Sequence, residues 1–335
     1  MAFLTRPLGK TGMDITRVGF GAWAAGGGGW AFSWGPQDDQ DSVSAIRHAV
    51  ESGINWVDTA AVYGLGHSEE VVADAMKGIP AADRPYIFTK CGLRWDKEDP
   101  YKPAKRVGAP ESIRAEVEAS LRRLAVEAID LCQMHWPAED GARLEDYWGT
   151  LLQLKAEGKI RAAGLSNHDM VLLEAAEARG HVDTLQPPFS AIRRTMAPEI
   201  AWCATHSTGV IVYSPMQAGL LTGAFSAARV AALHQDDWRA RNAEFRGERL
   251  ERNLALAEAL RPIADERGTT MAAVAVAWVL TWPGVTGAIV GARNAEQVNG
   301  WLPAANLELS ETELEDIARA IESTGAGDGP SRPAP

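Results

Sequence analysis

The chain has 335 residues, which is enough for one large domain or two ordinary ones, and 46% hydrophobic with 23% charged residues describes a globular protein with a sizeable core. A formal net charge of −11 argues against a nucleic-acid partner, because such partners select a basic face. The cysteines Cys91, Cys132 and Cys203 are widely spaced without a CxxC pair, which favours buried free thiols over a disulfide framework or a zinc site.

The N-terminal sequence MAFLTRPLGKTG lacks the apolar centre of a secretory signal. No apolar run approaches the roughly 18 residues of a membrane-spanning helix. We therefore expect a cytoplasmic protein with no membrane partner.

The predicted elements begin with residues 3–14, where the turn signal GKTG at 9–12 predicts a β-hairpin that could plug the floor of a barrel. From about residue 15, short apolar runs alternate with amphipathic stretches, which is the pattern of a parallel sheet covered by helices. Strands are predicted at 15–21, 54–60, 86–90, 129–136, 160–166, 184–190, 210–216 and 285–291. Helices are predicted at 39–52, 68–78, 111–125, 143–157, 169–179, 197–207, 250–282 (long enough for two) and 294–302.

The C-terminal part of the chain predicts one more helix at 310–323, opened by Ser310 and Glu313 as a capping box. Eight strand–helix pairs in one series favour an α/β fold, a (β/α)₈ TIM barrel with an N-terminal β-hairpin and a C-terminal extra helix. Residues 1–323 are predicted to form this single barrel. Residues 324–335 are rich in Gly and Pro and are predicted to be a disordered tail.

A competing fold signal is GFGAWA at 19–24, which reads as G-x-G-x-x-A, the fingerprint of an open dinucleotide-binding sheet. That fingerprint must open a helix whose N-terminus faces a pyrophosphate. Here the glycines continue into AGGGGWAFSWGP, and no helical pattern begins before about Asp38. We therefore favour the closed barrel.

Polar residues with chemical potential collect where the predicted strands end, at the face that carries catalysis in such barrels. A Tyr hydroxyl has a pKa of about 10, so it serves as an acid at neutral pH only if a nearby cation favours the phenolate. Lys90 could supply that cation for Tyr63, and Asp58 could pair with Lys90. His135 could then donate an N–H to the same substrate oxygen.

The successive motifs WVDTAAVYG (56–64), FTKCG (88–92), QMHWP (133–137), GLSN (164–167) and GARNAEQV (291–298) resemble those of the aldo-keto reductase superfamily, in particular its bacterial members. The resemblance spans nearly the whole chain. It implies NADPH as the usual reductant and a catalytic tetrad of Asp58, Tyr63, Lys90 and His135.

The same resemblance implies the cofactor contacts. Ser166, Asn167 and Gln186 would hold the nicotinamide carboxamide, and Tyr213 would stack on the ring. The residues that resemble the loop over the pyrophosphate are Ser214, Pro215, Met216, Gly219 and Leu221. Gly21 and Trp23, at the end of the first barrel strand, are also placed on the cofactor side.

The 2′-phosphate of NADP(H) is expected at Gly291, Ala292 and Arg293, where backbone N–H groups and a guanidinium meet the start of a helix. Gln297 fits the family's adenosine-contacting position. The family's usual Asn four residues later is Trp301 here, so the chain departs from the family pattern at the second adenine-contacting position.

The substrate pocket is inferred from aromatic residues in the loops at the catalytic rim, which suit an apolar or cyclic carbonyl. The residues assigned to substrate are Trp30, Trp34, Trp95 and Trp136, with Trp23 and Phe32 beside them.

Together these features predict a metal-free, NADP(H)-dependent oxidoreductase that acts on a small carbonyl or alcohol, as a monomer or a homo-oligomer, with the monomer favoured. The alternative is a cofactor-sensing regulatory subunit of the same fold. Residues 216–248, with Gly219 and Gly223, resemble a mobile flap, which favours the enzyme because a catalyst must release its cofactor every cycle.

Overall fold

The computed structural model describes residues 3–333, and its centre is a closed barrel of eight strands. The strands pair in the order β10-β11-β12-β3-β4-β5-β8-β9, and every pair between neighbours in this barrel is parallel. Their bounds are β3 (Val18–Gly21), β4 (Trp56–Asp58), β5 (Tyr86–Cys91), β8 (Ile129–Met134), β9 (Ile160–Ser166), β10 (Thr184–Gln186), β11 (Gly209–Val212) and β12 (Val285–Gly291). The predicted (β/α)₈ barrel is confirmed.

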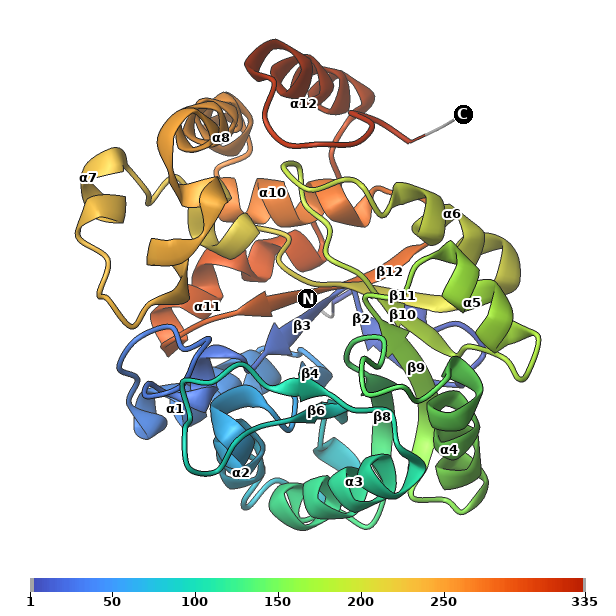
Figure 1. Cartoon of the computed structure of the whole chain (residues 1–335). Helices are drawn as coiled ribbons and strands as arrows, with labels where there is room; N and C mark the ends of the chain where they lie inside the picture. The colour runs from blue at the N-terminus through green and yellow to red at the C-terminus, as the bar shows by residue number, and fades with distance from the viewer. Residues whose placement is uncertain (1–2, 334–335) are drawn as a thin grey trace.

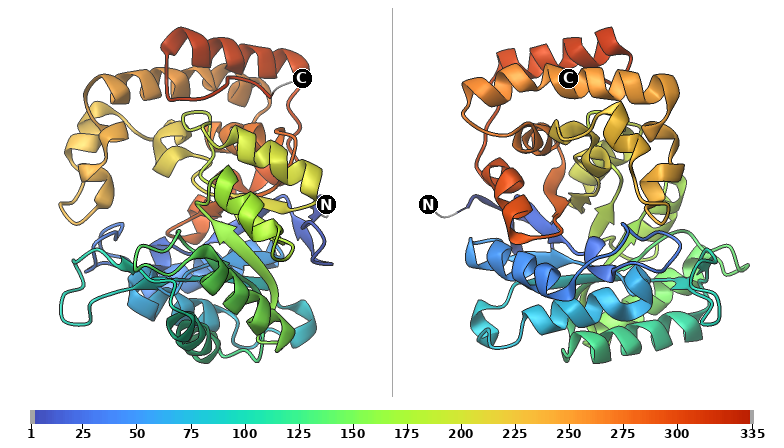
Figure 2. Two further views of the ribbon diagram at one scale, coloured as in Figure 1. Left: turned by 45° about the vertical axis from the view of Figure 1, so that its right-hand side comes forward. Right: turned by 90° about the vertical axis from the view of Figure 1, so that its left-hand side faces the viewer.

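Helices surround the barrel (Figure 1). Those that follow the strands are α1 (Asp39–Glu51), α2 (His67–Ala75), α3 (Pro110–Leu124), α4 (Leu144–Ala156), α5 (Met170–Glu177), α6 (Ala197–His206), α10 (Met271–Leu280) and α11 (Ala295–Trp301). The others are α7 (Ala227–Ala231), α8 (Gly247–Ala259), α9 (Arg261–Glu266) and α12 (Glu311–Thr324). α8 and α12 lie side by side at one end of the molecule (Figure 2).

Local sequence explains where several helices begin. The Asp38 side chain accepts from the backbone N–H groups of Gln40 and Asp41 and so caps α1. Ser310 and Glu313 form the predicted capping box of α12. α10 has the sequence MAAVAVAWVL and is buried at every residue, as expected for a helix that is apolar on all sides.

The N-terminal hairpin consists of β1 (Thr5–Pro7) and β2 (Asp14–Thr16), and it plugs the barrel as predicted. Leu8, Met13 and Ile15 are buried in a cluster that fills the barrel interior. The other members of this cluster come from the strands: Trp56, Phe88, Leu131, Ala162, Ile211 and Ile289. A larger cluster fills the layer between strands and helices.

Some boundaries differ from the prediction. Residues 15–16 belong to the hairpin and not to the first barrel strand. The stretch 250–282 forms three helices, because Pro262 and the Gly268 turn interrupt it. A second small hairpin, β6 (Leu93–Arg94) with β7 (Lys105–Arg106), was not predicted because each strand is only two residues long.

The expected disorder of residues 324–335 also differs from the structure. Thr324 ends α12, and the carbonyl oxygens of Ala326 and Gly329 accept hydrogen bonds from the buried Arg194 side chain. At Gly327, a Cβ would lie 1.6 Å from the carbonyl oxygen of Ile192. The glycines that suggested disorder therefore permit close backbone packing, while residues 334–335 lie outside the described residues.

Candidate active site

The four residues proposed as the tetrad meet at the carboxyl ends of neighbouring strands. Asp58 ends β4, Lys90 is the penultimate residue of β5, and His135 follows β8. Tyr63 opens the short helical turn η2 (Tyr63–Gly66) after β4. Since β4, β5 and β8 are adjacent in the barrel, parallel pairing brings the four side chains to one rim.

Lys90 and Asp58 form a buried ion pair. Nζ of Lys90 donates to Asp58 Oδ1 at 2.5 Å and to the carbonyl oxygen of Thr59 at 2.8 Å. The two side chains are 1% and 3% exposed. Such a pair is costly to desolvate, and it persists here because both ions are also hydrogen-bonded.

The Tyr63 ring is held by its neighbours. Nζ of Lys90 lies 5.1 Å from the centre of the ring. The ring of His135 meets it edge-on, at 5.8 Å between centroids and 79° between planes. Trp23 stacks on it at 5.8 Å and 16°. The turn that carries Tyr63 packs so closely on Gly26 that a Cβ there would lie 2.6 Å from the N atom of Gly64.

The electrostatics correct one expectation, that Lys90 would make Tyr63 more acidic. Burial raises the pKa of Tyr63 well above its ordinary value, and the Asp58 carboxylate raises it further. The charge of Lys90 is largely offset by Asp58, because the two are in direct contact. Tyr63 therefore keeps its proton at neutral pH and can donate it.

The other tetrad pKa values shift mainly through burial. Burial lowers the pKa of His135 well below its ordinary value, and the charges of Lys90 and Arg106 lower it further, so the imidazole is neutral. Burial raises the pKa of Asp58, opposed by Lys90 and Gln186. Burial lowers the pKa of Lys90, opposed by Asp58. A neutral imidazole N–H next to the Tyr63 ring can bind a carbonyl oxygen.

The residues expected to hold a carboxamide form one hydrogen-bonded chain next to the tetrad. Asn167 Nδ2 donates to the His135 carbonyl oxygen and to Ser166 Oγ, and Asn167 Oδ1 accepts from the Tyr213 hydroxyl at 2.7 Å. Ser166 Oγ donates in turn to the carbonyl oxygen of Gln186. Gln186 differs from the simple expectation, because its Nε2 donates to Asp58 Oδ2 at 2.9 Å.

The segment after β11 has an irregular backbone. Ser214, Gln217 and Ala218 have φ values of 57°, 46° and 53°, and Asn167 across the rim has 62°. Positive φ at non-glycine residues is strained and collects at functional sites. Gly219, at φ 99°, continues this turn. Of the other residues assigned to it, Met216 is half-buried while Pro215 and Leu221 are buried, so the last two face the core.

The residues assigned to the cofactor phosphate lie at the end of β12. Gly291 is exposed, is paired with Gly21 of β3, and is followed by buried Ala292. Arg293 Nε donates to Gln37 Oε1 at 2.7 Å, and its guanidinium also contacts the carbonyl oxygen of Pro36. Both partners are neutral, so the charge of Arg293 is available to an anion.

Gln297 is tied into the same corner. Its Oε1 accepts from the backbone N–H of Arg293 at 2.9 Å. Trp301, at the position where the family's Asn was expected, is buried in the core and so packs inward.

Aromatic side chains cover the rim above Tyr63. Trp23 stacks on Trp238 at 5.3 Å, and Trp34 meets both of them edge-on. Trp30 is buried and lies 6.5 Å from the Tyr63 ring. The sequence analysis did not assign Trp238 to the site, because this residue lies in the charged run HQDDWRARNAEFRGER. A single Trp in such a run was the signal that could have identified it.

Trp238 brings part of the proposed flap onto this rim. Its backbone N–H donates to the Ser33 carbonyl oxygen, and the Ser33 hydroxyl donates to Asp236. The stretch around Trp238 is thus docked on the loop after β3. The sequence pattern that predicted a flap at residues 216–248 did not predict these contacts with Ser33.

The remaining two residues assigned to substrate, Trp95 and Trp136, are not brought into this aromatic group. Trp95 follows β6 in the second hairpin. Trp136 follows His135, but its ring stacks under the Arg106 guanidinium at 4.4 Å. Among the residues that the structure describes, no ring contact links either of them to Tyr63.

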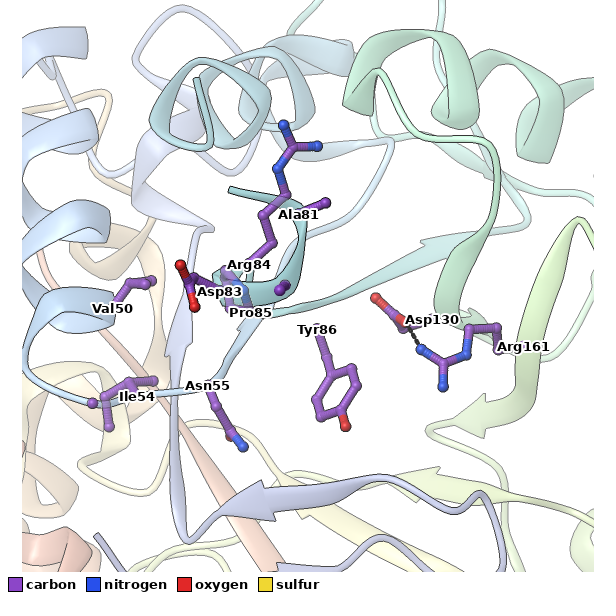
Figure 3. A pocket seen from close by; sticks show the side chains of 12 residues that line it. Val50, Ile54, Asn55, Ala81, Asp83, Arg84, Pro85, Tyr86, Asp130 and Arg161 are labelled. Carbon is purple, nitrogen blue, oxygen red and sulfur yellow. Dashed lines mark hydrogen bonds and ion pairs between the residues drawn. The ribbon is translucent and has the colours of Figure 1, made fainter. Parts of the chain in front are cut away.

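A cavity of about 560 Å³ lies at the opposite, amino-terminal ends of the strands (Figure 3). Its wall includes Tyr86, Asp130 and Arg161, at the starts of β5, β8 and β9. Asp130 already accepts from Arg161 and from the backbone N–H of Ile87. Since this face of such barrels serves stability, we assign no chemistry to it.

The described residues show neither a metal-binding cluster nor a membrane-spanning helix. Within residues 3–333, no group of three or more His, Cys, Asp and Glu side chains could hold a metal ion. None of the helices in that range is long and apolar enough to cross a membrane. All three cysteines are free and buried, as predicted.

Comparison with known proteins gives consistent matches along almost the whole chain. The family model described as "Aldo/keto reductase family" matches residues 17–322. The aldo-keto reductase YhdN of Bacillus subtilis is 32% identical over 319 residues, covering 95% of this chain and 93% of that protein. An NADH-specific methylglyoxal reductase of Escherichia coli is 33% identical, covering 94% of this chain and 98% of the relative. The structure of the glycerol dehydrogenase AKR11B4 from Gluconobacter oxydans superposes with a TM-score of 0.87 at 35% identity, covering 98% of both chains.

Proposed function

This chain belongs to the aldo/keto reductase family, and from that premise we propose that it is an NADP(H)-dependent reductase of aldehydes and ketones that also oxidises the corresponding alcohols. The observation that carries the proposal is the meeting of Tyr63, His135 and the Lys90–Asp58 pair at one rim of the barrel. Acid–base chemistry at one oxygen needs such a group of residues.

The residues divide the work at that oxygen. Tyr63 holds a proton at neutral pH and donates it to the carbonyl oxygen. The neutral His135 orients the same oxygen through an N–H. Lys90, whose ammonium lies 5.1 Å from the ring centre, is held there by Asp58, so the phenolate that forms as Tyr63 loses its proton lies beside an ion pair and not beside a free cation. Trp23, stacked on Tyr63, keeps water from one face of the ring.

Nicotinamide cofactors are typical of the family, and when bound the ring supplies the hydride. The donor set beside the tetrad fits such a ring, because Asn167 and Gln186 offer amide groups to a carboxamide and Tyr213 offers an aromatic face. The strained turn from Ser214 to Gly219 would lie along the pyrophosphate. Gly21, Gly291 and Ala292, at the ends of β3 and β12, would lie beside the rest of the cofactor.

Tyr63→Phe tests the acid. The ring keeps its stacking on Trp23, so we expect the cofactor dissociation constant to change by less than about threefold. Turnover of a good aldehyde should fall by about 10²- to 10⁴-fold. Tyr101→Phe removes the same hydroxyl from an exposed residue and should turn over normally. Wild-type kcat in Tyr63→Phe would disprove the assignment.

The preference for NADP(H) is supported by Arg293, whose guanidinium is bonded to two neutral groups, the Gln37 side chain and the Pro36 carbonyl oxygen. The Escherichia coli relative is named as NADH-specific, so the cofactor preference of this chain is to be tested by measuring NADPH and NADH binding. Arg293→Ala should weaken NADPH binding at least about tenfold and NADH binding little, because only NADPH carries the 2′-phosphate. Arg319→Ala, on an exposed ion pair of α12, is the control. Equal losses for both cofactors would refute the role of Arg293.

The substrate we propose is an apolar or cyclic carbonyl compound, supported by the aromatic group of Trp23, Trp30, Trp34 and Trp238 above Tyr63. Two relatives are named for small polar compounds, methylglyoxal and glycerol. Ranking a panel that contains both kinds by kcat/KM tests the proposal. If methylglyoxal or glycerol had the highest kcat/KM of the panel, the proposed substrate class would be wrong, while the proposed reaction would still hold.

A further inference from the structure

A hydrogen bond crosses the interior of the barrel between two opposite strands. In the closed ring, β10 and β4 are four positions apart among eight, so they face each other. Gln186 at the end of β10 donates from Nε2 to Asp58 Oδ2 at the end of β4, at 2.9 Å. Both residues are 2% exposed. Water therefore does not compete for this bond.

The two oxygens of Asp58 are divided between two donors. Lys90 binds Oδ1 at 2.5 Å, and Gln186 binds Oδ2 at 2.9 Å. An ionised carboxylate accepts at both oxygens, whereas a protonated carboxyl carries a hydrogen on one of them and loses one of these bonds. The pair of donors thus favours the ionised form and also fixes the rotation of the carboxylate.

The position of Gln186 is itself fixed from the neighbouring strand. Its carbonyl oxygen accepts from Ser166 Oγ at 2.9 Å and from the backbone N–H of Asn167 at 3.3 Å. Because Nε2 is used by Asp58, the amide oxygen is the end of the side chain left for a ligand. Gln186 therefore connects the proposed carboxamide site to the ion pair below Tyr63.

We propose that Gln186 is a positioning residue of the tetrad, which holds Asp58 ionised and aimed at Lys90, in addition to any contact with the cofactor. The inference rests on the proposed function, since it concerns how the same site works.

The other ionisable groups around Asp58 come from separate elements. Lys90 lies on β5, Tyr63 on η2 and His135 after β8, while Glu69 and Cys132 act on Lys90. Burial raises the pKa of Asp58, and the hydrogen bond from Gln186 is one of the interactions that lower it. All these groups remain when only Gln186 is replaced. A change in the titration of Asp58 then reports the loss of that one bond.

Gln186→Met tests the proposal, because methionine has a similar length and no donor. In the cofactor-free protein, the titration of Asp58 is followed by infrared difference spectroscopy of its carboxyl band, with Asp58→Asn to identify the band. We expect its pKa to rise by about one unit, which is the loss of one hydrogen bond to a charged group. Gln133→Met is the matched control, since Gln133 is another fully buried glutamine of the barrel and bonds to Thr184 instead.

The second measurement is the pH profile of kcat at saturating cofactor. Ionised Asp58 holds the Lys90 ammonium beside the Tyr63 ring. On the proposed function, the acid limb in Gln186→Met should therefore move upwards by the same unit, and in Gln133→Met it should stay. Gln186→Glu should restore activity towards acid pH, where its protonated carboxyl can donate to Asp58. It should lose activity as the pH rises and the two carboxylates repel each other.

A residue that only binds cofactor would behave differently. Gln186→Met would then raise the KM for cofactor, while the Asp58 titration and the acid limb of kcat would not move, and this result would overturn the proposal. The two hypotheses can fail separately. A shifted Asp58 titration together with full turnover in Tyr63→Phe would refute the proposed chemistry and keep the positioning of Asp58 by Gln186.

Discussion

Replacing Lys90 by Met should destabilise the protein in a way that depends on pH. The substitution leaves the Asp58 carboxylate 3% exposed with no cation in contact, while the hydrogen bond from Gln186 remains. Methionine is similar in length to the lysine side chain, so packing changes little. The dominant effect is then an uncompensated buried charge.

The magnitude follows from the burial of both partners. Removing one member of a buried pair costs about 3–5 kcal/mol at neutral pH. Burial already raises the pKa of Asp58, and loss of Lys90 raises it further. A carboxyl whose pKa is raised in the folded state lowers the free energy of unfolding at pH values above that folded-state pKa. It has no such effect at pH values below its unfolded-state pKa of 3.8. The deficit of the variant should therefore shrink as the pH falls from 7 towards 4.

Urea unfolding followed by tryptophan fluorescence at several pH values measures this deficit. Lys102→Met is the control, because Lys102 and Asp96 form an exposed ion pair that is screened by solvent. The double variant Lys90→Met with Asp58→Asn should recover part of the loss, since no buried charge remains. A variant as stable as wild type at pH 7, or a deficit that grows on acidification, would refute the reasoning.

Three further predictions follow from single contacts. Gly26→Ala places a Cβ 2.6 Å from Gly64 N and 2.8 Å from the Tyr63 carbonyl carbon, so it should displace Tyr63 and lower kcat about tenfold in an aldehyde assay, and unchanged kcat would contradict the close packing. Burial lowers the pKa of His168 from 6.5 to about 4, so its neutral form supports the fold above 6.5, and this support is lost as the pH falls towards 4. At pH 5 the loss is about 2 kcal/mol, which His168→Gln should largely remove from the pH dependence of the urea midpoint. Arg194→Met breaks the hydrogen bonds to the segment after α12 and should cost about 3 kcal/mol in urea unfolding, with faster proteolysis of that segment, whereas an unchanged midpoint would show that the contacts contribute nothing.

The fold, and the grouping of Asp58, Tyr63, Lys90 and His135 at one rim of it, could be predicted from the sequence alone. Strand–helix alternation is a local property of hydrophobic spacing, and eight repeats of it in series imply a closed barrel. The order of the motifs around Asp58, Tyr63, Lys90 and His135 places them at the strand ends. Parallel strands then bring those ends to a single rim, as observed.

Tertiary structure decided the rest, because it depends on contacts between residues far apart in the chain. Trp238 reaches Trp23 across 215 positions, and Gln186 reaches Asp58 across 128. A local sequence pattern spans far fewer residues than either separation, so it predicts neither contact. The sign of the Tyr63 pKa shift was likewise a property of burial and of Asp58, since the sequence shows which charges exist but not which of them are desolvated or already neutralised.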